Sequence, residues 1–401
     1  MRIVDVAEFY APKGGGVRTY IDAKIEAGNA VGHEIVIIAP GPEDRIDVRG
    51  RGRIIWVKAP ILAVDKRYHV FWSQAPVHAL LEAEAPDLVE ASSPWQGARI
   101  VARWQSPRGA TTPKVLFQHA DPVASYPQQW FGGRLSVEAI DRLFGFYWRY
   151  LRGVATGFDE IVVGGPWMAA RLAAQGLPMP IPVPMGVDTK TFTPARRSAE
   201  IRRGLLADCG LAEDATLLVG VGRHHIQKRW PLAIEAVGRA QVVQPNIGFV
   251  QIGDGMARAA VERAAAKVPH VVLKGHVGDR DTLATMLASG DALLHASSSE
   301  TYGLAVAEGL AAGLPLIAPA GGAVLDLLSP EWSESYTPHD AASAAAAIGR
   351  FQARDRDTMA TAAAHAGATV VGDSNAHFQR LFATYGRLVA EHHPLSKTAG
   401  D

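Results

Sequence analysis

The sequence is poor in the features that mark several specialised classes of protein. It has a single cysteine, Cys209, among 401 residues, which excludes an internal disulfide and favours a reducing compartment. Lys plus Arg and Asp plus Glu number 40 each, so the chain lacks the basic excess typical of nucleic-acid binding. It has no run of about 18 apolar residues to span a membrane, and residues 1–6 have the pattern of a strand, not of a signal segment. We therefore expect no nucleic-acid partner and a cytoplasmic location.

What the chain does contain is a regular alternation of short β-branched segments and longer Ala-rich segments. This order is typical of an α/β fold in which parallel sheets are covered by helices on both faces. A chain of this length fits two domains of roughly 150 to 200 residues, so we expect two doubly wound, Rossmann-like domains facing a central cleft. The expected strands are 2–6, 34–39, 54–57, 88–90, 114–118, 160–163, 217–221, 247–252, 271–273, 292–295 and 316–318.

Two glutamates, Glu300 and Glu308, lie eight positions apart around Gly303, where a short apolar strand gives way to an Ala- and Leu-rich helix. The unpaired N–H groups and the positive dipole at a helix N-terminus attract phosphate groups. A pyrophosphate would therefore bind the backbone of Gly303 and Leu304. Of the two carboxylates, Glu300 would bind sugar hydroxyls and Glu308 a ribose diol. The alternative is an acidic first turn that only complements the helix dipole.

Arg223 and Lys228 follow the expected strand 217–221, at the carboxyl end where the ligand of such a sheet binds. Two cations beside a pyrophosphate would neutralise the charge that develops on a departing nucleoside diphosphate. The sequence contains no metal-binding motif, so we expect a site that needs neither a metal nor another cofactor. The alternative is an ordinary exposed basic loop.

Four stretches together resemble the retaining glycosyltransferases of family 4, which have the GT-B architecture and an E-x7-E signature. They are residues 13–18 (KGGGVR), 184–188 (PMGVD) with Phe192, 220–223 (GVGR) with Lys228, and 300–308, and they occur in the order and at the spacing of that family. The resemblance implies an acceptor-binding domain over residues 1–187 and a donor-binding domain over residues 188–372. It also implies that residues 373–401 form a helix that crosses back to the first domain, followed by a tail.

The resemblance further implies a retaining hexosyltransferase, which moves a hexosyl unit from a UDP- or GDP-linked sugar to a hydroxyl of a lipid, lipid-linked or glycan acceptor. The implied catalytic residues are His119, Arg223, Lys228 and Glu300. The implied donor-binding residues are Gly15, Gly16, Val277, Tyr302, Gly303, Leu304 and Glu308. In this scheme His119 contacts the donor sugar from the end of strand 114–118, and Val277 lies against the nucleobase. A lone histidine at a strand end is alternatively structural.

Residues 140–154 combine aromatic and leucine side chains with arginines in one expected helix. A basic, aromatic amphipathic helix is suited to a membrane interface, which predicts a peripheral contact at the inner face of the membrane. The alternative is a core helix of the first domain, because the aromatic residues surround the helix instead of forming one stripe.

Two other functions stay open at the level of sequence. A non-catalytic GT-B protein that binds a sugar nucleotide would keep Arg223, Lys228 and Glu308 but would need neither His119 nor Glu300, and all five are present. A GT-B sugar-nucleotide epimerase is disfavoured by the E-x7-E segment. Donor turnover with a panel of acceptors separates the enzyme from the binding protein.

Overall fold

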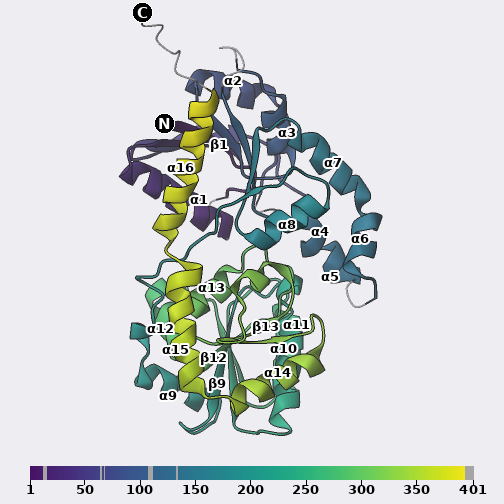
Figure 1. Cartoon of the computed structure of the whole chain (residues 1–401), viewed down its shortest axis with the longest axis vertical. Coiled ribbons are helices and arrows are strands. Elements are labelled where there is room, and N and C mark those ends of the chain that lie inside the picture. Colours follow the sequence, from purple (N-terminus) through teal and green to yellow (C-terminus); the bar gives the residue numbers. More distant parts are fainter. Residues whose placement is uncertain (12–15, 64–65, 67, 107–111, 132–133, 393–401) are drawn as a thin grey trace, which may run out of the picture.

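The computed structural model describes residues 1–392 apart from 12–15, 64–65, 67, 107–111 and 132–133. These residues form two sheets, one in each half of the chain, with helices packed on both faces of each sheet (Figure 1). The first half lies above the second in this view, and the two meet along one boundary. The prediction of an α/β fold with two doubly wound, Rossmann-like units is confirmed.

The first sheet has eight strands in the order β3-β4-β2-β1-β5-β6-β7-β8. Neighbouring strands are parallel except β3 and β4, which form an antiparallel pair. The strands are β1 (Arg2–Val6), β2 (Glu34–Gly41), β3 (Arg45–Arg49), β4 (Gly52–Lys58), β5 (Leu88–Ala91), β6 (Lys114–Gln118), β7 (Glu160–Val163) and β8 (Ile181–Pro182). The sequence predicts neither β3, whose side chains are largely exposed, nor β8, which is only two residues long.

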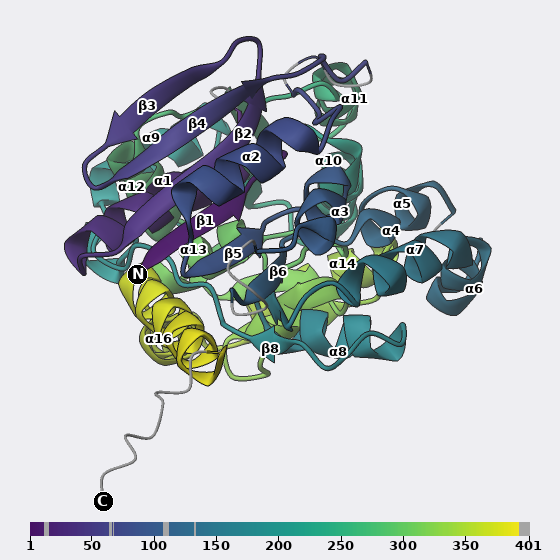
Figure 2. The same cartoon turned by 90° about the horizontal axis from the view of Figure 1, so that it is seen from above.

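Helices cover both faces of the first sheet because its strands are apolar on both sides. One face carries α1 (Gly16–Ala30) and the C-terminal α16 (Ser374–His392). The other carries α2 (Ala75–Glu84), α3 (Gln96–Arg103), α7 (Gly145–Ala155) and α8 (Pro166–Ala174). Three short helices at the margin of this domain are α4 (Pro122–Ser125), α5 (Pro127–Phe131) and α6 (Val137–Leu143) (Figure 2).

The second sheet has six strands, all parallel, in the order β11-β10-β9-β12-β13-β14. The strands are β9 (Thr216–Val221), β10 (Ile247–Ile252), β11 (Val271–Gly275), β12 (Ala292–Leu294), β13 (Leu316–Pro319) and β14 (Ser333–Tyr336). The sequence does not predict β14, an edge strand that is polar at three of its four positions. Edge strands need fewer apolar residues because one side of the strand has no neighbour.

The helices of the second half again form two layers. One face of the sheet carries α9 (Ala199–Asp208), α12 (Arg280–Ala288), α13 (Leu304–Ala311) and α15 (Arg356–Ala366). The other carries α10 (Trp230–Gln241), α11 (Arg258–Ala265) and α14 (Ala341–Ala353). Short helical turns are η1 (Pro194–Arg196), η2 (Ile226–Lys228), η3 (Gly322–Leu327) and η4 (Gly367–Val371).

Two segments of the chain cross between the halves side by side. The Val187 N–H donates to the Gly372 carbonyl at 3.3 Å, and the Ser374 N–H donates to the Val187 carbonyl at 2.9 Å. A Cβ atom placed on Gly186 would lie 2.4 Å from the backbone of Asp373. Glycine is therefore required at position 186 by the close approach of the second segment.

Helix α16 belongs to the core of the first half, although it follows the second half in sequence (Figure 1). Its residues Phe378 and Leu381 are buried with Ile21 of α1. The Tyr385 hydroxyl donates to Glu90 Oε2 at 2.6 Å, and Lys24 Nζ donates to the same oxygen at 2.5 Å. The last helix therefore ties the end of the chain to the first sheet.

Residues 140–154 do not form the single helix that the sequence predicts. Helix α6 ends at Leu143 and α7 begins at Gly145, because the backbone of Phe144 leaves the helical conformation and glycine continues a helix poorly. Within α7, Trp148 is buried in the first core while Phe146 is 66% exposed. The core alternative is therefore correct for one face of α7, and the other face is a surface.

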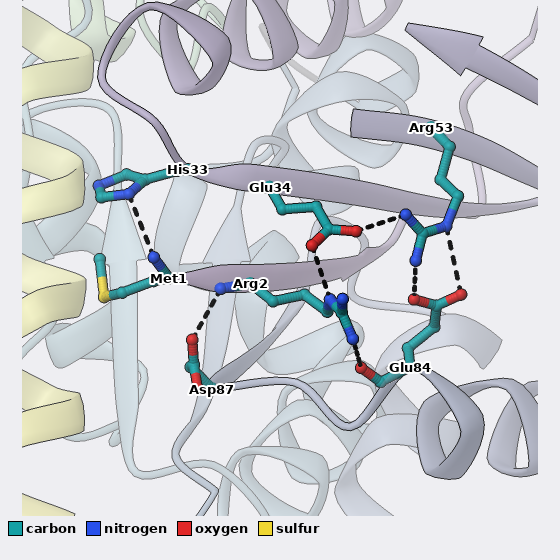
Figure 3. A network of polar contacts seen from close by, with 7 residues as sticks. All are labelled: Met1, Arg2, His33, Glu34, Arg53, Glu84 and Asp87. Carbon is teal, nitrogen blue, oxygen red and sulfur yellow. Dashed lines mark hydrogen bonds and ion pairs between the residues drawn. The ribbon is translucent and has the colours of Figure 1, made fainter. Parts of the chain in front are cut away.

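A polar network fixes the amino ends of the strands in the first sheet (Figure 3). Arg2 Nε donates to Glu34 Oε2 at 2.9 Å, and Arg2 Nη1 donates to the Glu84 carbonyl at 2.6 Å. Arg53 forms ion pairs with both Glu34 and Glu84. The network joins the starts of β1 and β2 to β4 and to the end of α2. This edge of the sheet is stabilised by the network. In a doubly wound sheet a ligand binds at the opposite edge, at the carboxyl ends of the strands.

Candidate active site

Loops at the carboxyl ends of the two sheets contact one another. Thr301, in the loop after β12, donates its hydroxyl to the carbonyl of His119, directly after β6, at 2.7 Å. A Cβ atom on Gly16, the first residue of α1, would lie 3.9 Å from Leu304 Cδ1 at the start of α13. One helix from each domain therefore begins at the same place. Two such N-termini favour an anion between them.

Glu300 lies beside this point and is held by a lysine of the neighbouring loop. Lys228 Nζ is 2.7 Å from Glu300 Oε1, and His295 Nε2 is 3.5 Å from the same oxygen. Burial raises the pKa of Glu300, but the Lys228 charge and the contacts from His295 and Lys228 outweigh it and hold the pKa well below its ordinary value. Glu300 is therefore an ionised carboxylate with its free oxygen available to a hydroxyl group.

Gly303 opens α13 as the sequence predicts. It is the N-cap residue with a φ of 87°, a left-handed conformation that glycine adopts without strain. Further along α13, Glu308 Oε1 is 3.2 Å from an Arg280 guanidinium nitrogen, and that guanidinium lies over the ring of Phe192. Burial raises the pKa of Glu308, against the lowering effect of Arg280. Glu300 and Glu308 thus flank the helix N-terminus in different electrostatic surroundings.

His119 occupies the first-domain side of the site. Its ring stacks on Phe117 with centroids 4.0 Å apart and meets Tyr20 edge-on at 4.8 Å. Burial, followed by the charge of Lys24 and the nearby His377, lowers the pKa of His119 to about 3. Its Nε2 atom is buried and has no hydrogen-bond partner within the described residues. The imidazole is therefore neutral near pH 7 and has one nitrogen available to a ligand.

The remaining predicted residues are less tightly gathered. Tyr302 is buried beside Gly303, and Val277 is half-buried in the loop after β11. Arg223 is exposed after β9, and no hydrogen bond or ion pair of its guanidinium is found among the residues that the structure describes. Gly15 lies outside the described residues.

Two further contacts join the domains near the site. Asp326 in η3 accepts hydrogen bonds from the Trp167 N–H in the first turn of α8, at 2.9 and 3.1 Å. Arg229 Nε donates to Gln129 Oε1 at 2.8 Å. These contacts and the bond between Thr301 and His119 fix the distance between the two sides of the site.

Neither a metal centre nor a membrane span is evident in the described parts of the chain. No group of three or more His, Cys, Asp or Glu side chains there is arranged to hold a metal ion. No helix there is both long and apolar enough to cross a bilayer.

Comparison with known families agrees with this geometry. Residues 14–191 match the family model described as Glycosyltransferase Family 4, and residues 215–353 match the model described as Glycosyl transferases group 1. The chain belongs to glycosyltransferase family 4. Its two facing Rossmann-like domains have the GT-B fold, as the sequence predicts.

Curated relatives of this glycosyltransferase include mannosyltransferases. It is 29% identical over 330 residues to the GDP-mannose-dependent alpha-(1-6)-phosphatidylinositol dimannoside mannosyltransferase of Mycobacterium tuberculosis, covering 82% of each chain. It is 25% identical to the GDP-mannose-dependent alpha-mannosyltransferase of Corynebacterium glutamicum, covering 82% of this chain and 75% of the relative.

Solved structures with the same fold have lower identity. Sucrose-phosphate synthase from Thermosynechococcus elongatus superposes with a TM-score of 0.75 at 18% identity, covering 98% of this glycosyltransferase and 100% of that chain. Anabaena HepE in complex with UDP superposes with a TM-score of 0.72 at 15% identity, covering 96% and 100%.

Sequence reasoning on this glycosyltransferase missed two residues that hold the signature glutamates. Arg280 is 28 positions from Glu308, and no local motif links them. His295 directly follows β12. Its position at the end of a strand, like that of His119, was the signal that could have identified it as a site residue. The prediction from sequence assigns Lys228 to the leaving group only, whereas in the structure Lys228 also forms an ion pair with Glu300.

Proposed function

We propose that this enzyme is a retaining hexosyltransferase that uses a nucleoside-diphosphate sugar. The observation that carries the proposal is the ion pair between Lys228 and Glu300, beside two helix N-termini that begin at Gly16 and Leu304. This arrangement offers positive potential to a pyrophosphate and a fixed carboxylate to the sugar attached to it. The names of the curated relatives favour GDP-mannose as the donor and a lipid such as a phosphatidylinositol glycoside as the acceptor.

Each donor group has a residue suited to it. The backbone at Gly303 and Leu304 binds the pyrophosphate together with Gly15 and Gly16, and Tyr302 closes the turn behind it. Glu308 accepts hydrogen bonds from the ribose diol, supported by Arg280. Val277 lies against the nucleobase. The neutral His119 forms a hydrogen bond with a sugar hydroxyl through Nε2, a buried ring nitrogen that has no partner among the described residues.

Transfer proceeds on one face of the sugar. The bond from the anomeric carbon to the phosphate oxygen breaks, and the acceptor oxygen bonds to the same carbon from the leaving-group side. The acceptor proton passes to the departing phosphate oxygen. Lys228 and Arg223 stabilise the negative charge on the diphosphate, so the step needs no metal ion. Glu300 orients the sugar.

The division of the chain follows the same proposal. Residues 1–187 bind the acceptor, residues 188–372 bind the donor, and residues 373–401 return to the first domain. The crossing of residues 186–187 with 372–374 supports these boundaries. A lipid acceptor would bring the enzyme to the inner face of a membrane, with the exposed Phe146 in segment 140–154 as a point of contact.

The stereochemistry of the product tests the mechanism. An α-linked sugar nucleotide must give an α-linked product, because attack and departure share one face. Proton NMR of the anomeric signal in the first-formed product decides the matter. A β-linked product would overturn the retaining mechanism and the role of Glu300. Donor binding without turnover over a broad acceptor panel would instead indicate a non-catalytic binding protein.

A further inference from the structure

A cavity lies away from the donor site, on the outer surface of the first domain between α3 and α7. These helices lie side by side in both views (Figures 1 and 2). The cavity has a volume of about 500 Å³ and is lined by Arg99, Arg103, Arg149 and Tyr150, together with smaller residues such as Gly153. Three of its side chains are therefore cationic.

The three arginines have no anionic partner in the part of the chain that the structure describes. Within the described residues no ion pair or side-chain hydrogen bond involves Arg99, Arg103 or Arg149, whereas the nearby Arg171 is paired with Asp121 and Asp141. Arg99 and Arg103 are also four positions apart on α3, a spacing at which like charges repel on a helix. An arrangement that is unfavourable for folding points to a ligand that offsets it.

The cavity is held open by contacts beside it. The Tyr150 hydroxyl donates to the Trp95 carbonyl at 3.1 Å, which fixes α7 against the start of α3. Gly153 has no side chain to fill the cavity, and nothing lies within 4 Å of a Cβ atom placed there. The arginines therefore line a space and not a packed contact.

The position of the cavity separates it from the donor site. Helix α3 starts near the carboxyl ends of the strands, where the Gly97 N–H donates to Glu8. It ends near the opposite edge, where Lys114 Nζ at the start of β6 donates to the Trp104 carbonyl. Arg103 belongs to that far edge, whereas the residues assigned to the donor lie mostly on the second domain.

We propose that this cavity binds a phosphate group, either as a free phosphate or as the head group of a phospholipid. Guanidinium groups match phosphate oxygens with paired hydrogen bonds, and three of them supply enough charge for a dianion. Trp95 and Phe146 are exposed at 39% and 66%, and Trp95 accepts the hydrogen bond from Tyr150, which lines the cavity. Phe146 and Arg149 share one face of α7, so an aromatic side chain stands next to the anion site.

The test uses the full chain and two double variants with the same change of charge. Arg99→Gln with Arg149→Gln removes two arginines of the cavity. Arg49→Gln with Arg51→Gln removes two exposed arginines from the β3–β4 hairpin of the same domain. Binding is measured by titration with inorganic phosphate, and by co-sedimentation with phosphatidylcholine vesicles that contain or lack phosphatidylglycerol.

We expect the cavity variant to bind its probe roughly 30-fold more weakly than the wild type and the hairpin variant to bind normally. Weaker binding of inorganic phosphate identifies a soluble ligand, and weaker binding of anionic vesicles alone identifies a phospholipid. Equal losses in both variants, or no binding of either probe by the wild type, would overturn the proposal. Affinity for GDP should stay unchanged in both variants, so this result is independent of the proposed transfer reaction.

Discussion

The two sides of the active site differ in how they handle charge. The second domain presents ion pairs, Lys228 with Glu300 and Arg280 with Glu308, whereas the first domain presents His119, which is neutral and stacked on an aromatic ring. In the proposed mechanism the charged side chains that meet the leaving group, Lys228 and Arg223, come from the second domain, and the first domain adds only the N-terminus of α1 at Gly16. The first domain would contribute hydrogen bonds and shape to the sugar and the acceptor. Variants that change only one side of the site therefore test this difference more directly than variants that weaken ligand binding in general.

The largest effect is expected from removing the lysine on the charged side. In Lys228→Met the carboxylate of Glu300 loses its ion-pair partner and the leaving group loses a cation, so turnover should fall by about 10²- to 10³-fold. Initial rates at saturating donor measure this. Lys267→Met makes the same chemical change at an exposed position beyond α11 and should leave turnover unchanged. A folded Lys228→Met enzyme with normal turnover would contradict the assignment.

A smaller loss is expected at the second glutamate of the signature. Glu308→Ala should raise the dissociation constant for GDP by about 30-fold, because a charge-assisted hydrogen bond to the ribose contributes about 2 kcal/mol. Isothermal titration calorimetry measures the change. Glu262→Ala, on the exposed side of α11, serves as the control. Unchanged affinity in a folded Glu308→Ala protein would refute the ribose role.

On the neutral side, His119 should affect stability with a definite dependence on pH. The unfolded chain binds a proton on this residue as the pH falls below 6.5, while the folded protein does not until about pH 3. Stability is therefore lost as the pH falls through this window. His119→Asn should reduce that loss by up to about 1.4 kcal/mol per pH unit.

Urea unfolding near pH 7 and near pH 5 tests this prediction. The neighbouring His377, whose pKa is also lowered, to about 4, remains in the variant and retains its own part of the slope. Identical slopes for wild type and His119→Asn would show that His119 takes up its proton over the same pH range in the folded protein as in the unfolded chain. The contrast between a charged side and a neutral side would then fail.

The smallest effect is expected from removing metal ions. If Arg223 and Lys228 supply the positive charge, excess chelator should leave the rate of transfer unchanged. Loss of activity that added Mg²⁺ restores would mean that the charged side is incomplete without a metal.

Much of the fold follows from local patterns in the sequence. Strands buried on both faces, such as β2 over residues 35–39, are apolar without interruption, and Gly303 marks the start of α13 by itself. The exposed β3 and the polar edge strand β14 lack such a pattern, and the break in segment 140–154 depends on one glycine. The spacing of apolar residues over a short stretch of sequence does not reveal these three features.

The site was predicted less completely than the fold, for a related reason. Glu300, Gly303 and Glu308 lie within one short segment, so their spacing could be recognised. Arg280 and His295 act on them from other elements, and only the folded chain brings them within 3.2 to 3.5 Å. The charge state of His119 likewise depends on burial, which the sequence at that position does not reveal.

The paired crossing at Gly186 and Asp373 determines how the two domains can move. Because two segments joined by backbone hydrogen bonds make the connection, a rotation of one domain must bend both segments together. Two adjacent linkers restrict twisting and sliding of the domains more than they restrict a hinge rotation about a single axis. Opening about this connection would break the hydrogen bond from the Thr301 hydroxyl to the His119 carbonyl on the far side of the site.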